Sequence, residues 1–312
     1  MKTAILGSGL IGRSWAMVFA RGGHEVVLWD QDVAQVDKAL AHIARTLPDM
    51  AEAGLIEDAE TVRRRITGAA SLADAVSGVE FIQENIVERA APKQKLFAEV
   101  EKLAPADAII SSSTSAIMPS IIFGGLATRQ RCLVSHPLNP PHLAPIVELC
   151  GADFTSPDII TRAGDFMASC GMSPITVKRE IEGFILNRLQ LAVLNESFRL
   201  IAEGYVSAED LDKTIKDGLA LRWSFMGPIE TIDLNAPQGV ADYLERYGPT
   251  IRRVGDSQSA AAAWPDSIGA TLDVERRAAV PKEKLEDATA WRDRRMMALT
   301  AHKRAQEKKT PR

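Results

Sequence analysis

His136 and Glu148 are side chains that can move a proton, and they lie twelve positions apart in the stretch SHPLNPPHLAPIVELC. His136 follows the apolar run CLVS, so it should emerge at the carboxyl end of a strand, where open α/β sheets bind ligands. Glu148 interrupts the apolar run PIVEL, and a carboxylate buried there needs a polar partner. A histidine is the obvious partner. The pair predicts a general base with a carboxylate behind it, although a loop histidine and an edge-strand charge would give the same letters.

A second motif stands at the start of the chain. Residues 7–12, GSGLIG, fit the pattern G-x-G-x-x-G, and Asp30 ends the next apolar run, HEVVLWD. A strand before the glycines, a helix after them and an acid at the end of the following strand form the context of dinucleotide binding. The residues expected at the cofactor are Gly7, Gly9, Leu10, Ile11, Gly12 and Asp30. A 2′-phosphate would be repelled by Asp30 and no arginine follows it closely, so NAD is favoured over NADP.

The elements that must position these residues alternate between strand and helix. KTAILG, HEVVLWD, FIQENI, AIISSST and CLVSHP are apolar runs of strand length, and Ile11–Arg21 and KQKLFAEVEKL have helical spacing. This alternation predicts an α/β fold with a Rossmann-type parallel sheet. An alanine-rich, charged stretch from about Val33 to Arg65, with breaks at Leu47–Pro48 and Gly54, predicts an inserted helical hairpin.

The second half of the chain has a different pattern. Long amphipathic segments begin near residue 182, among them ILNRLQLAVLNESFRLIAEG, so we expect two domains, a nucleotide-binding domain over residues 1–181 and an all-helical domain over residues 182–312. FAD also uses the glycine pattern, but the helical second half and the His136 segment favour a soluble nicotinamide. The last stretch, residues 282–312, alternates in charge and predicts a solvated helix with a basic end.

Composition excludes several classes of function. The chain has 312 residues, of which 46% are hydrophobic and 25% charged, so it should fold into a soluble globular protein. A net charge of -4 gives no general attraction to nucleic acid or to an anionic membrane, and no run approaches the length of a membrane span. Cys132, Cys150 and Cys170 are an odd number without a CxxC pair. They predict buried thiols in a cytoplasmic protein and no metal site.

Together these motifs make the chain resemble the L-3-hydroxyacyl-CoA dehydrogenase superfamily over nearly its whole length. The resemblance implies catalytic roles for a serine in SSSTSAIMPS, the histidine and glutamate named above, and an asparagine in GFILNRLQ, which are Ser115, His136, Glu148 and Asn187. It also implies that Glu88 and Lys93 in ENIVERAAPKQKLF lie near the nicotinamide ribose. The implied reaction is NAD-dependent oxidation of a secondary alcohol in a homodimer whose helical domains pair.

Within the superfamily, HPLNPPHLAPIVEL and DGLALRWSFMGPIETIDLNA look most like the L-gulonate 3-dehydrogenase and λ-crystallin branch. Acyl-CoA enzymes usually carry a short Gly-Tyr-Pro-Met-Gly-Pro-like stretch where this chain has LRWSFMGP. Arg222 in that segment could bind the carboxylate of a free 3-hydroxy acid such as L-gulonate, or could form an ordinary salt bridge. A 3-hydroxyacyl-CoA or carnitine dehydrogenase is the alternative. A non-catalytic, crystallin-like protein is less expected, because all four catalytic residues are present.

Overall fold

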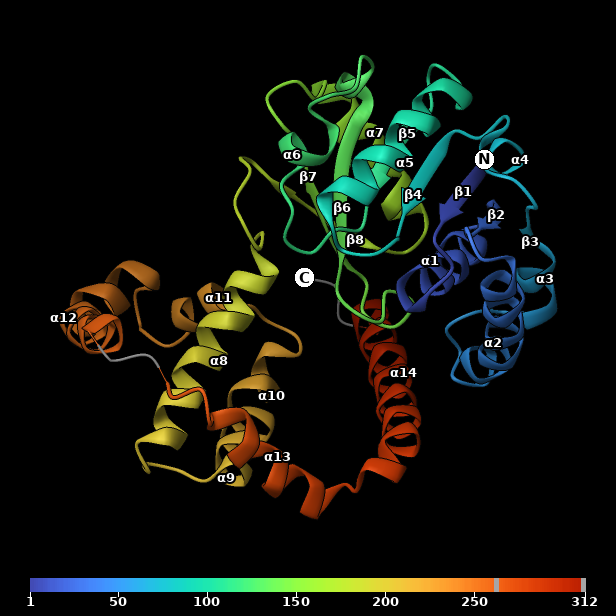
Figure 1. The fold of residues 1–312 in the computed structure, drawn as a ribbon. Coiled ribbons are helices and arrows are strands. Elements are labelled where there is room, and N and C mark those ends of the chain that lie inside the picture. Colours follow the sequence, from blue (N-terminus) through green and yellow to red (C-terminus); the bar gives the residue numbers. More distant parts are fainter. Residues whose placement is uncertain (261–263, 310–312) are drawn as a thin grey trace. The chain divides into compact units, whose positions relative to one another are not determined.

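The structure, a computed structural model, describes residues 1–260 and 264–309 and contains two compact units (Figure 1). The first consists of Met1–Arg188 together with the chain from Trp291 onward, and the second of Leu189–Ala290. The predicted helical segment, residues 182–312, is therefore divided between the two units, and its last three residues lie outside the described part.

One sheet of eight strands forms the centre of the first unit, in the order β3-β2-β1-β4-β5-β6-β7-β8 (Figure 1). The strands are β1 (Lys2–Leu6), β2 (Glu25–Trp29), β3 (Ile66–Gly68), β4 (Phe81–Glu84), β5 (Ile109–Ser112), β6 (Cys132–Pro137), β7 (Ile146–Cys150) and β8 (Ser173–Val177). The order reverses between β1 and β4, which is the switch point at which open α/β sheets bind ligands. The predicted Rossmann-type sheet is confirmed.

The sheet departs from the parallel prediction at one pairing, because β7 runs antiparallel to β6. Strand β8 pairs parallel with β7, so these two strands run opposite to the other six. The loop that joins β6 to β7 covers only residues 138–145, which is too short for the crossover that a parallel neighbour requires. This reversal places His136 directly opposite Glu148 in the strand register.

Helices cover both faces of the sheet, so its strands are buried on both sides. Ile5 of β1 belongs to a core cluster with Phe19, whereas its neighbour Leu6 belongs to a second cluster with Phe97. The helices of this unit are α1 (Leu10–Arg21), α2 (Val33–Glu52), α3 (Ala59–Arg64), α4 (Leu72–Val76), α5 (Ala90–Leu103), α6 (Pro119–Phe123) and α7 (Pro157–Ser169), with a 3-10 turn at Arg129–Arg131.

The predicted helical hairpin is present as α2 and α3, but the break expected at Leu47–Pro48 is wrong. Helix α2 continues through Pro48 to Glu52, and the turn comes at Gly54, which has a φ of +72°. Leu47 and Met50 of this helix are buried in the core. Their packing on both sides of Pro48 offsets the hydrogen bond that proline cannot make.

The C-terminal helix α14 (Leu285–Lys309) packs against the first unit from Trp291 onward. Met297 is buried in the core, and the Thr300 hydroxyl donates to the carbonyl of Leu143 at 3.0 Å. The prediction of a solvated helix is therefore wrong for this face. Charges dominate the sequence of α14 so strongly that one buried methionine leaves no clear periodic signal.

The second unit is helical in all its described elements. It contains most of α8 (Leu186–Ala202), then α9 (Ala208–Lys213), a π-helical segment (Thr214–Leu219), α10 (Ala220–Trp223), α11 (Pro228–Asp233), α12 (Val240–Ala260), α13 (Ile268–Ala279) and a 3-10 turn (Lys282–Lys284). Several large apolar side chains of this unit are exposed, including Leu189 at 62% and Phe225 at 64%. Among the residues that the structure describes, no helix has the length and apolar character of a bilayer span.

Candidate active site

The glycine-rich turn between β1 and α1 has the close contacts that a dinucleotide site needs. Gly7 has a φ of +91°, and a Cβ on Gly12 would lie 1.8 Å from the Gly7 carbonyl oxygen, so helix α1 can approach the strand only without a side chain there. A Cβ on Gly9 would meet nothing within 4 Å. The start of α1 is therefore open, and its backbone amides can face an anion.

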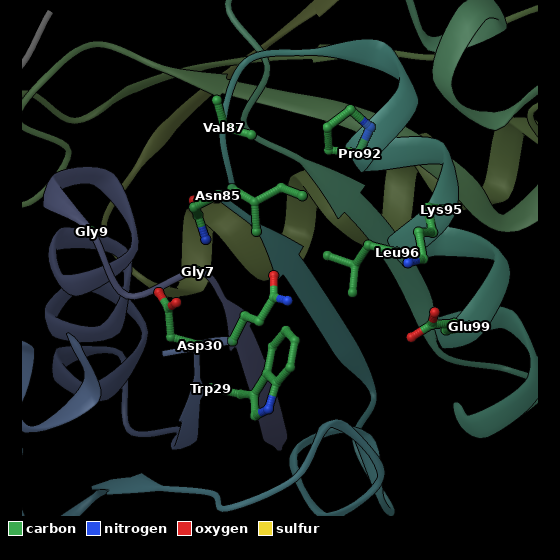
Figure 2. Close-up of a pocket in the computed structure, with 12 residues that line it drawn as sticks. Gly7, Gly9, Trp29, Asp30, Asn85, Val87, Pro92, Lys95, Leu96 and Glu99 are labelled. Atoms are coloured by element: carbon green, nitrogen blue, oxygen red, sulfur yellow. The ribbon is translucent and has the colours of Figure 1, made fainter. Parts of the chain in front are cut away.

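Asp30 is held against this turn. The backbone amide and hydroxyl of Ser8 donate to Asp30 Oδ2 at 2.7 and 3.0 Å. Beside it lies a cavity of about 560 Å³. Figure 2 shows Asp30 and Trp29 on one side of this cavity and Leu96, Lys95 and Glu99 of α5 on the other. The turn, the acid and the cavity fit the adenosine part of a dinucleotide.

Not every residue predicted for the cofactor lines this cavity. Gly7, Gly9 and Asp30 do, whereas Leu10, Ile11 and Gly12 do not. The side chain of Leu10 is 50% exposed and that of Ile11 packs against the core. Contact of these two residues with a pyrophosphate, through the backbone at the start of α1, stays a prediction.

The structure places His136 and Glu148 in contact across strands β6 and β7. His136 Nδ1 lies 2.7 Å from Glu148 Oε2, and the two residues are 4% and 0% exposed. The other carboxylate oxygen accepts the backbone amides of Ile185 and Leu186, both at 2.9 Å. Glu148 thus orients the imidazole with one oxygen and binds the first turn of α8 with the other.

Phe184, which sequence reasoning did not select, packs against this pair. Its ring lies 5.5 Å from the His136 ring, centroid to centroid, and the residue is fully buried. Its φ of +49° is the only left-handed value at a non-glycine residue in the described chain. Such a conformation persists only where the surroundings hold it, here by the ring packing and by the amides that follow. No local sequence signal predicts it.

Ser115 and Asn187 are also in contact, although 72 positions separate them. The side-chain amide of Asn187 donates from Nδ2 to the backbone carbonyl of Ser115 at 2.8 Å. Because Asn187 directly follows the two amides bound to Glu148, the His136 pair and the Ser115 loop are joined through the start of α8. The structure therefore brings the four predicted catalytic residues into one connected set.

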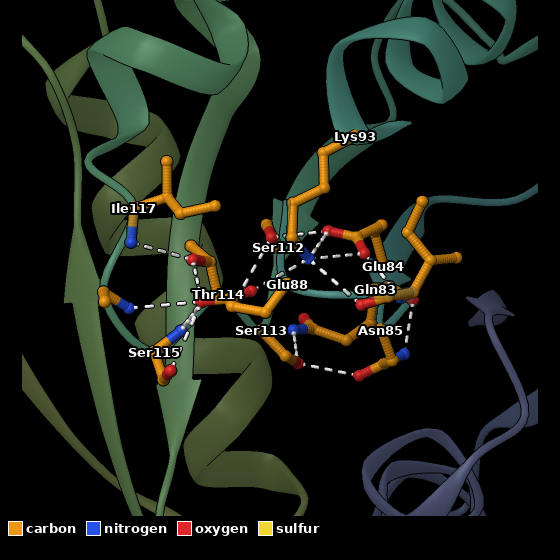
Figure 3. A network of polar contacts seen from close by, with 12 residues as sticks. Gln83, Glu84, Asn85, Glu88, Lys93, Ser112, Ser113, Thr114, Ser115 and Ile117 are labelled. Carbon is orange, nitrogen blue, oxygen red and sulfur yellow. Dashed lines mark hydrogen bonds and ion pairs between the residues drawn. The ribbon is translucent and has the colours of Figure 1, made fainter. Parts of the chain in front are cut away.

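Glu88 holds the Ser115 loop from the other side (Figure 3). Its Oε1 accepts the Thr114 hydroxyl at 2.6 Å, the Ser115 amide at 2.7 Å and, at longer range, the Ser115 hydroxyl and the Ala116 amide at 3.3 Å. Partial burial acts to raise the pKa of Glu88, but these hydrogen bonds and the charge of Lys93 lower it overall.

Lys93, predicted near the cofactor, is buried and 1% exposed. Its ammonium bonds both oxygens of Glu84, at 2.8 and 2.9 Å, and lies 3.4 Å from Glu88 Oε2 (Figure 3). Burial raises the pKa of the Glu84 carboxyl, although Lys93 and the Ser112 hydroxyl oppose this effect. Sequence reasoning missed Glu84. The argument applied to Glu148, that a carboxylate ending an apolar strand needs a partner, would have found it.

A second group of polar contacts joins the Ser115 loop to the cofactor cavity (Figure 3). The Ser113 hydroxyl accepts Trp15 Nε1 at 2.8 Å and Gln83 Nε2 at 2.6 Å, and donates to Asn85 Oδ1 at 2.7 Å. Asn85 lines the cavity. The segment that carries the candidate serine is thus fixed to Gln83 of β4 and to Asn85 at the cavity.

Two other predictions concern residues away from this set. Arg222 lies in α10 of the second unit with an exposed side chain, and its contact with a substrate stays a prediction. The three cysteines are free and buried, as predicted, and burial raises the pKa of each thiol to about 12.

Comparison with known proteins identifies relatives over almost the full chain. Residues 2–181 match the family model described as 3-hydroxyacyl-CoA dehydrogenase, NAD binding domain, and residues 183–267 match the model of its C-terminal domain. Lambda-crystallin from Oryctolagus cuniculus is 40% identical over 96% of this chain and 95% of its own length. An L-carnitine dehydrogenase from Bacillus cereus is 36% identical over 80% of this chain and 77% of its own. A solved structure described as FHMPC 5-dehydrogenase, an NAD+ dependent dismutase, has the same fold, with a TM-score of 0.83 at 24% identity over 96% of both chains.

Proposed function

We propose that this chain, which belongs to the 3-hydroxyacyl-CoA dehydrogenase family of NAD-dependent oxidoreductases, oxidises the 3-hydroxyl group of a small, free L-3-hydroxy acid. The observation that carries the proposal is the buried contact of 2.7 Å between His136 and Glu148, joined through the start of α8 to Asn187 and Ser115. An imidazole oriented by a carboxylate, with a serine and an asparagine joined to the same segment, is an arrangement suited to general-base chemistry at a hydroxyl group.

In this proposal His136 is the general base. Its Nδ1 donates to Glu148, which leaves Nε2 without a proton and able to accept one from the substrate hydroxyl. Glu148 then stabilises the imidazolium that forms. NAD, when bound, would accept the hydride from the carbon that carries this hydroxyl. Ser115 and Asn187 hydrogen-bond the substrate oxygen as it changes from hydroxyl to carbonyl.

Two observations support a free acid as the substrate. The segments HPLNPPHLAPIVEL and DGLALRWSFMGPIETIDLNA resemble the L-gulonate 3-dehydrogenase and λ-crystallin branch, in agreement with the 40% identity to Lambda-crystallin over nearly the full chain. Arg222 supplies an exposed cation in the helical unit. A guanidinium can bind a carboxylate through two parallel hydrogen bonds. L-gulonate and L-3-hydroxybutyrate are the first substrates to test.

The test is a panel of substrates with NAD and NADP, followed by absorbance at 340 nm. We expect reduction of NAD, in preference to NADP, by L-gulonate or L-3-hydroxybutyrate, and a loss of at least ~10² in turnover in His136→Ala with NAD affinity retained. No turnover on any 3-hydroxy acid would refute the proposal. Near-normal turnover of His136→Ala would remove His136 from its role.

The role of Arg222 has its own test. Arg222→Met should raise the Michaelis constant for an acid substrate about tenfold or more, with a smaller change in turnover number, because a charge-assisted bond to the bound acid is lost. An unchanged Michaelis constant would mean that Arg222 forms a salt bridge without contact to substrate.

The alternative substrates are L-carnitine and a 3-hydroxyacyl-CoA. The L-carnitine dehydrogenase relative favours the first, and Trp223 and Phe225 are exposed aromatic side chains that could contact a quaternary ammonium group. The family models favour the second. Activity on L-carnitine, or oxidation of NADH with acetoacetyl-CoA, exceeding that on free acids would select one of them. A purely structural, crystallin-like protein would show no activity on any of these substrates.

We also propose a homodimer that pairs the helical units, in the cytoplasm. Exposed apolar side chains of the second unit, such as Leu189, Leu221, Phe225 and Leu234, support a protein contact there, and the three free cysteines support a reducing compartment. Light scattering coupled to gel filtration should give twice the chain mass of 33.9 kDa. Leu189→Glu should shift the protein toward monomer.

A further inference from the structure

The Ser113 hydroxyl has three hydrogen-bond partners, which use its one donor and two acceptor positions. Trp15 Nε1, which can only donate, lies 2.8 Å from the Ser113 oxygen, and Gln83 Nε2 lies 2.6 Å from it. Gln83 Nε2 also lies 3.3 Å from the backbone carbonyl of Ser135, which can only accept, so this end of the Gln83 amide is the donating one. The hydroxyl proton of Ser113 is therefore left for its third partner, Asn85 Oδ1.

This pattern of donors determines the orientation of the Asn85 side chain (Figure 3). Its Oδ1 accepts the Ser113 hydroxyl at 2.7 Å, and its Nδ2 donates to the backbone carbonyl of Gln83 at 2.9 Å. A side-chain amide nitrogen carries two hydrogens. No acceptor in the described part of the chain binds the second one, so one N–H donor of Asn85 is available to a ligand.

Asn85 lies beside the glycine-rich turn. Its backbone amide donates to the Leu6 carbonyl at 2.6 Å, and a Cβ on Gly7 would lie 2.8 Å from the carbonyl carbon and oxygen of Asn85. The side chain is half-buried, and the residue lines the cofactor cavity together with Gly9 and Asp30 (Figure 2). The pyrophosphate of a dinucleotide lies at such a turn, so the expected ligand brings acceptor oxygens close to Asn85.

We propose that Asn85 is a cofactor-binding residue whose free side-chain N–H donates to an oxygen of NAD beyond the adenosine, in the pyrophosphate or in the nicotinamide ribose. Trp15 and Ser113 are positioning residues that keep the nitrogen end of this amide available. The inference deepens the cofactor site on which the proposed function rests, and its test requires no substrate.

Isothermal titration of the full-length protein with NAD, ADP and adenosine tests the contact without turnover. In Asn85→Ala the dissociation constant for NAD should rise about tenfold or more, because a hydrogen bond to the cofactor is lost. The constant for adenosine should change less than about threefold. An equal rise for ADP assigns the contact to the pyrophosphate, and an unchanged constant for ADP assigns it to the nicotinamide ribose. Wild-type affinity for NAD would overturn the inference.

Asn85→Asp separates the donor from the shape of the side chain. Aspartate has nearly the same shape as asparagine, but its carboxylate has no N–H and repels a pyrophosphate. The dissociation constant for NAD should therefore be at least as high as in Asn85→Ala. Affinity restored by aspartate would mean that Asn85 acts through packing alone, which contradicts the proposed contact.

The positioning role of Ser113 has a separate test. Ser113→Ala removes the hydroxyl that holds Asn85 Oδ1, so the amide can turn over, and the dissociation constant for NAD should rise about threefold or more. Adding Ser113→Ala to Asn85→Ala should cause no further loss, because the hydroxyl acts through the amide. Additive losses in the double variant would remove Ser113 from this role.

Gln94 of α5 provides the matched control. Its exposed side-chain amide also donates to a backbone carbonyl, that of Ile121 at 2.7 Å, but the residue lies outside the set that lines the cavity. Gln94→Ala should leave the dissociation constants for all three ligands unchanged. If the wild-type protein binds NAD but oxidises no 3-hydroxy acid, the proposed function fails, and the titrations still decide whether Asn85 binds the cofactor.

Discussion

A second histidine, His142, lies in the loop that joins β6 to β7 and has no role in the proposed chemistry. It is 5% exposed, and its Nδ1 lies 3.2 Å from the Ser14 hydroxyl, which itself donates to the Leu10 carbonyl. The Ser14 oxygen therefore accepts from Nδ1. Burial, with the nearby charge of Arg21, lowers the pKa of His142 from 6.5 to about 3. His142 is thus a neutral core residue at physiological pH.

This lowered pKa predicts a dependence of stability on pH. Between pH 6.5 and about 3 the unfolded chain binds a proton at His142 and the folded chain does not, so the free energy of unfolding falls as the pH falls. The free energy of unfolding should fall by about 1.4 kcal/mol for each pH unit below 6.5. Above pH 6.5 the full stabilising contribution of His142 is present. Urea unfolding at pH 7, 6 and 5 should show a flatter dependence in His142→Asn than in the wild type.

The exposed histidine of α14 provides a control for this prediction. His302→Asn should keep the wild-type dependence of unfolding on pH. Equal slopes for His142→Asn and the wild type would mean that His142 takes up its proton without unfolding.

At the scale of elements, Glu148 connects three segments of the first unit. It lies in β7, orients His136 of β6 and binds two amides at the start of α8. A carboxylate at a helix start satisfies amides that have no partner within the helix. The same side chain thus orients His136 in the candidate active site and binds the first amides of α8, the helix that carries Asn187.

Two variants of Glu148 should separate these roles. In Glu148→Gln the amide oxygen can still accept from Ile185 and Leu186, but the amide nitrogen then faces His136 Nδ1 and favours the tautomer with its proton on Nε2. Turnover should fall at least ~10² with little change in the unfolding midpoint. Glu148→Ala should also lose about 1–3 kcal/mol of stability, because buried amides lose their acceptor. Equal stability of the two variants would contradict the second role.

At the scale of the whole molecule, the chain returns to its first unit after leaving it. Helix α14 contributes Met297 to the core that also contains Trp15 and Phe19 of α1. The thioether side chain fills part of a dense core, and its loss leaves a cavity. The first unit therefore depends on residues at both ends of the sequence.

Two substitutions on α14 should differ sharply. Met297→Ala should lower the free energy of unfolding by about 2–5 kcal/mol, as expected for a buried methionine. Leu299→Ala, at a position that is 50% exposed, should change it by less than about 0.5 kcal/mol. Denaturant unfolding followed by circular dichroism measures both values. Similar effects would show that α14 does not pack on the first unit in solution.

The sequence alone determined the features that depend on neighbouring residues. The glycine turn, the acid of Asp30 and the alternation of strands and helices follow from patterns that span a few residues or one βαβ unit, and these predicted the Rossmann-type sheet and NAD. The resemblance then named Ser115 and Asn187, which no local pattern pairs, since 72 positions separate them.

Tertiary structure decided which distant residues meet. The antiparallel strand β7 sets His136 against Glu148, and the order of β4, β5 and α5 brings Glu84 to Lys93 and Ser112. The sequence likewise did not predict the burial of Lys93 and Met297, because both lie in segments rich in charged residues. The reason is physical: spacing along the chain encodes local conformation, whereas burial and hydrogen-bond partners depend on how strands order and register in the folded sheet.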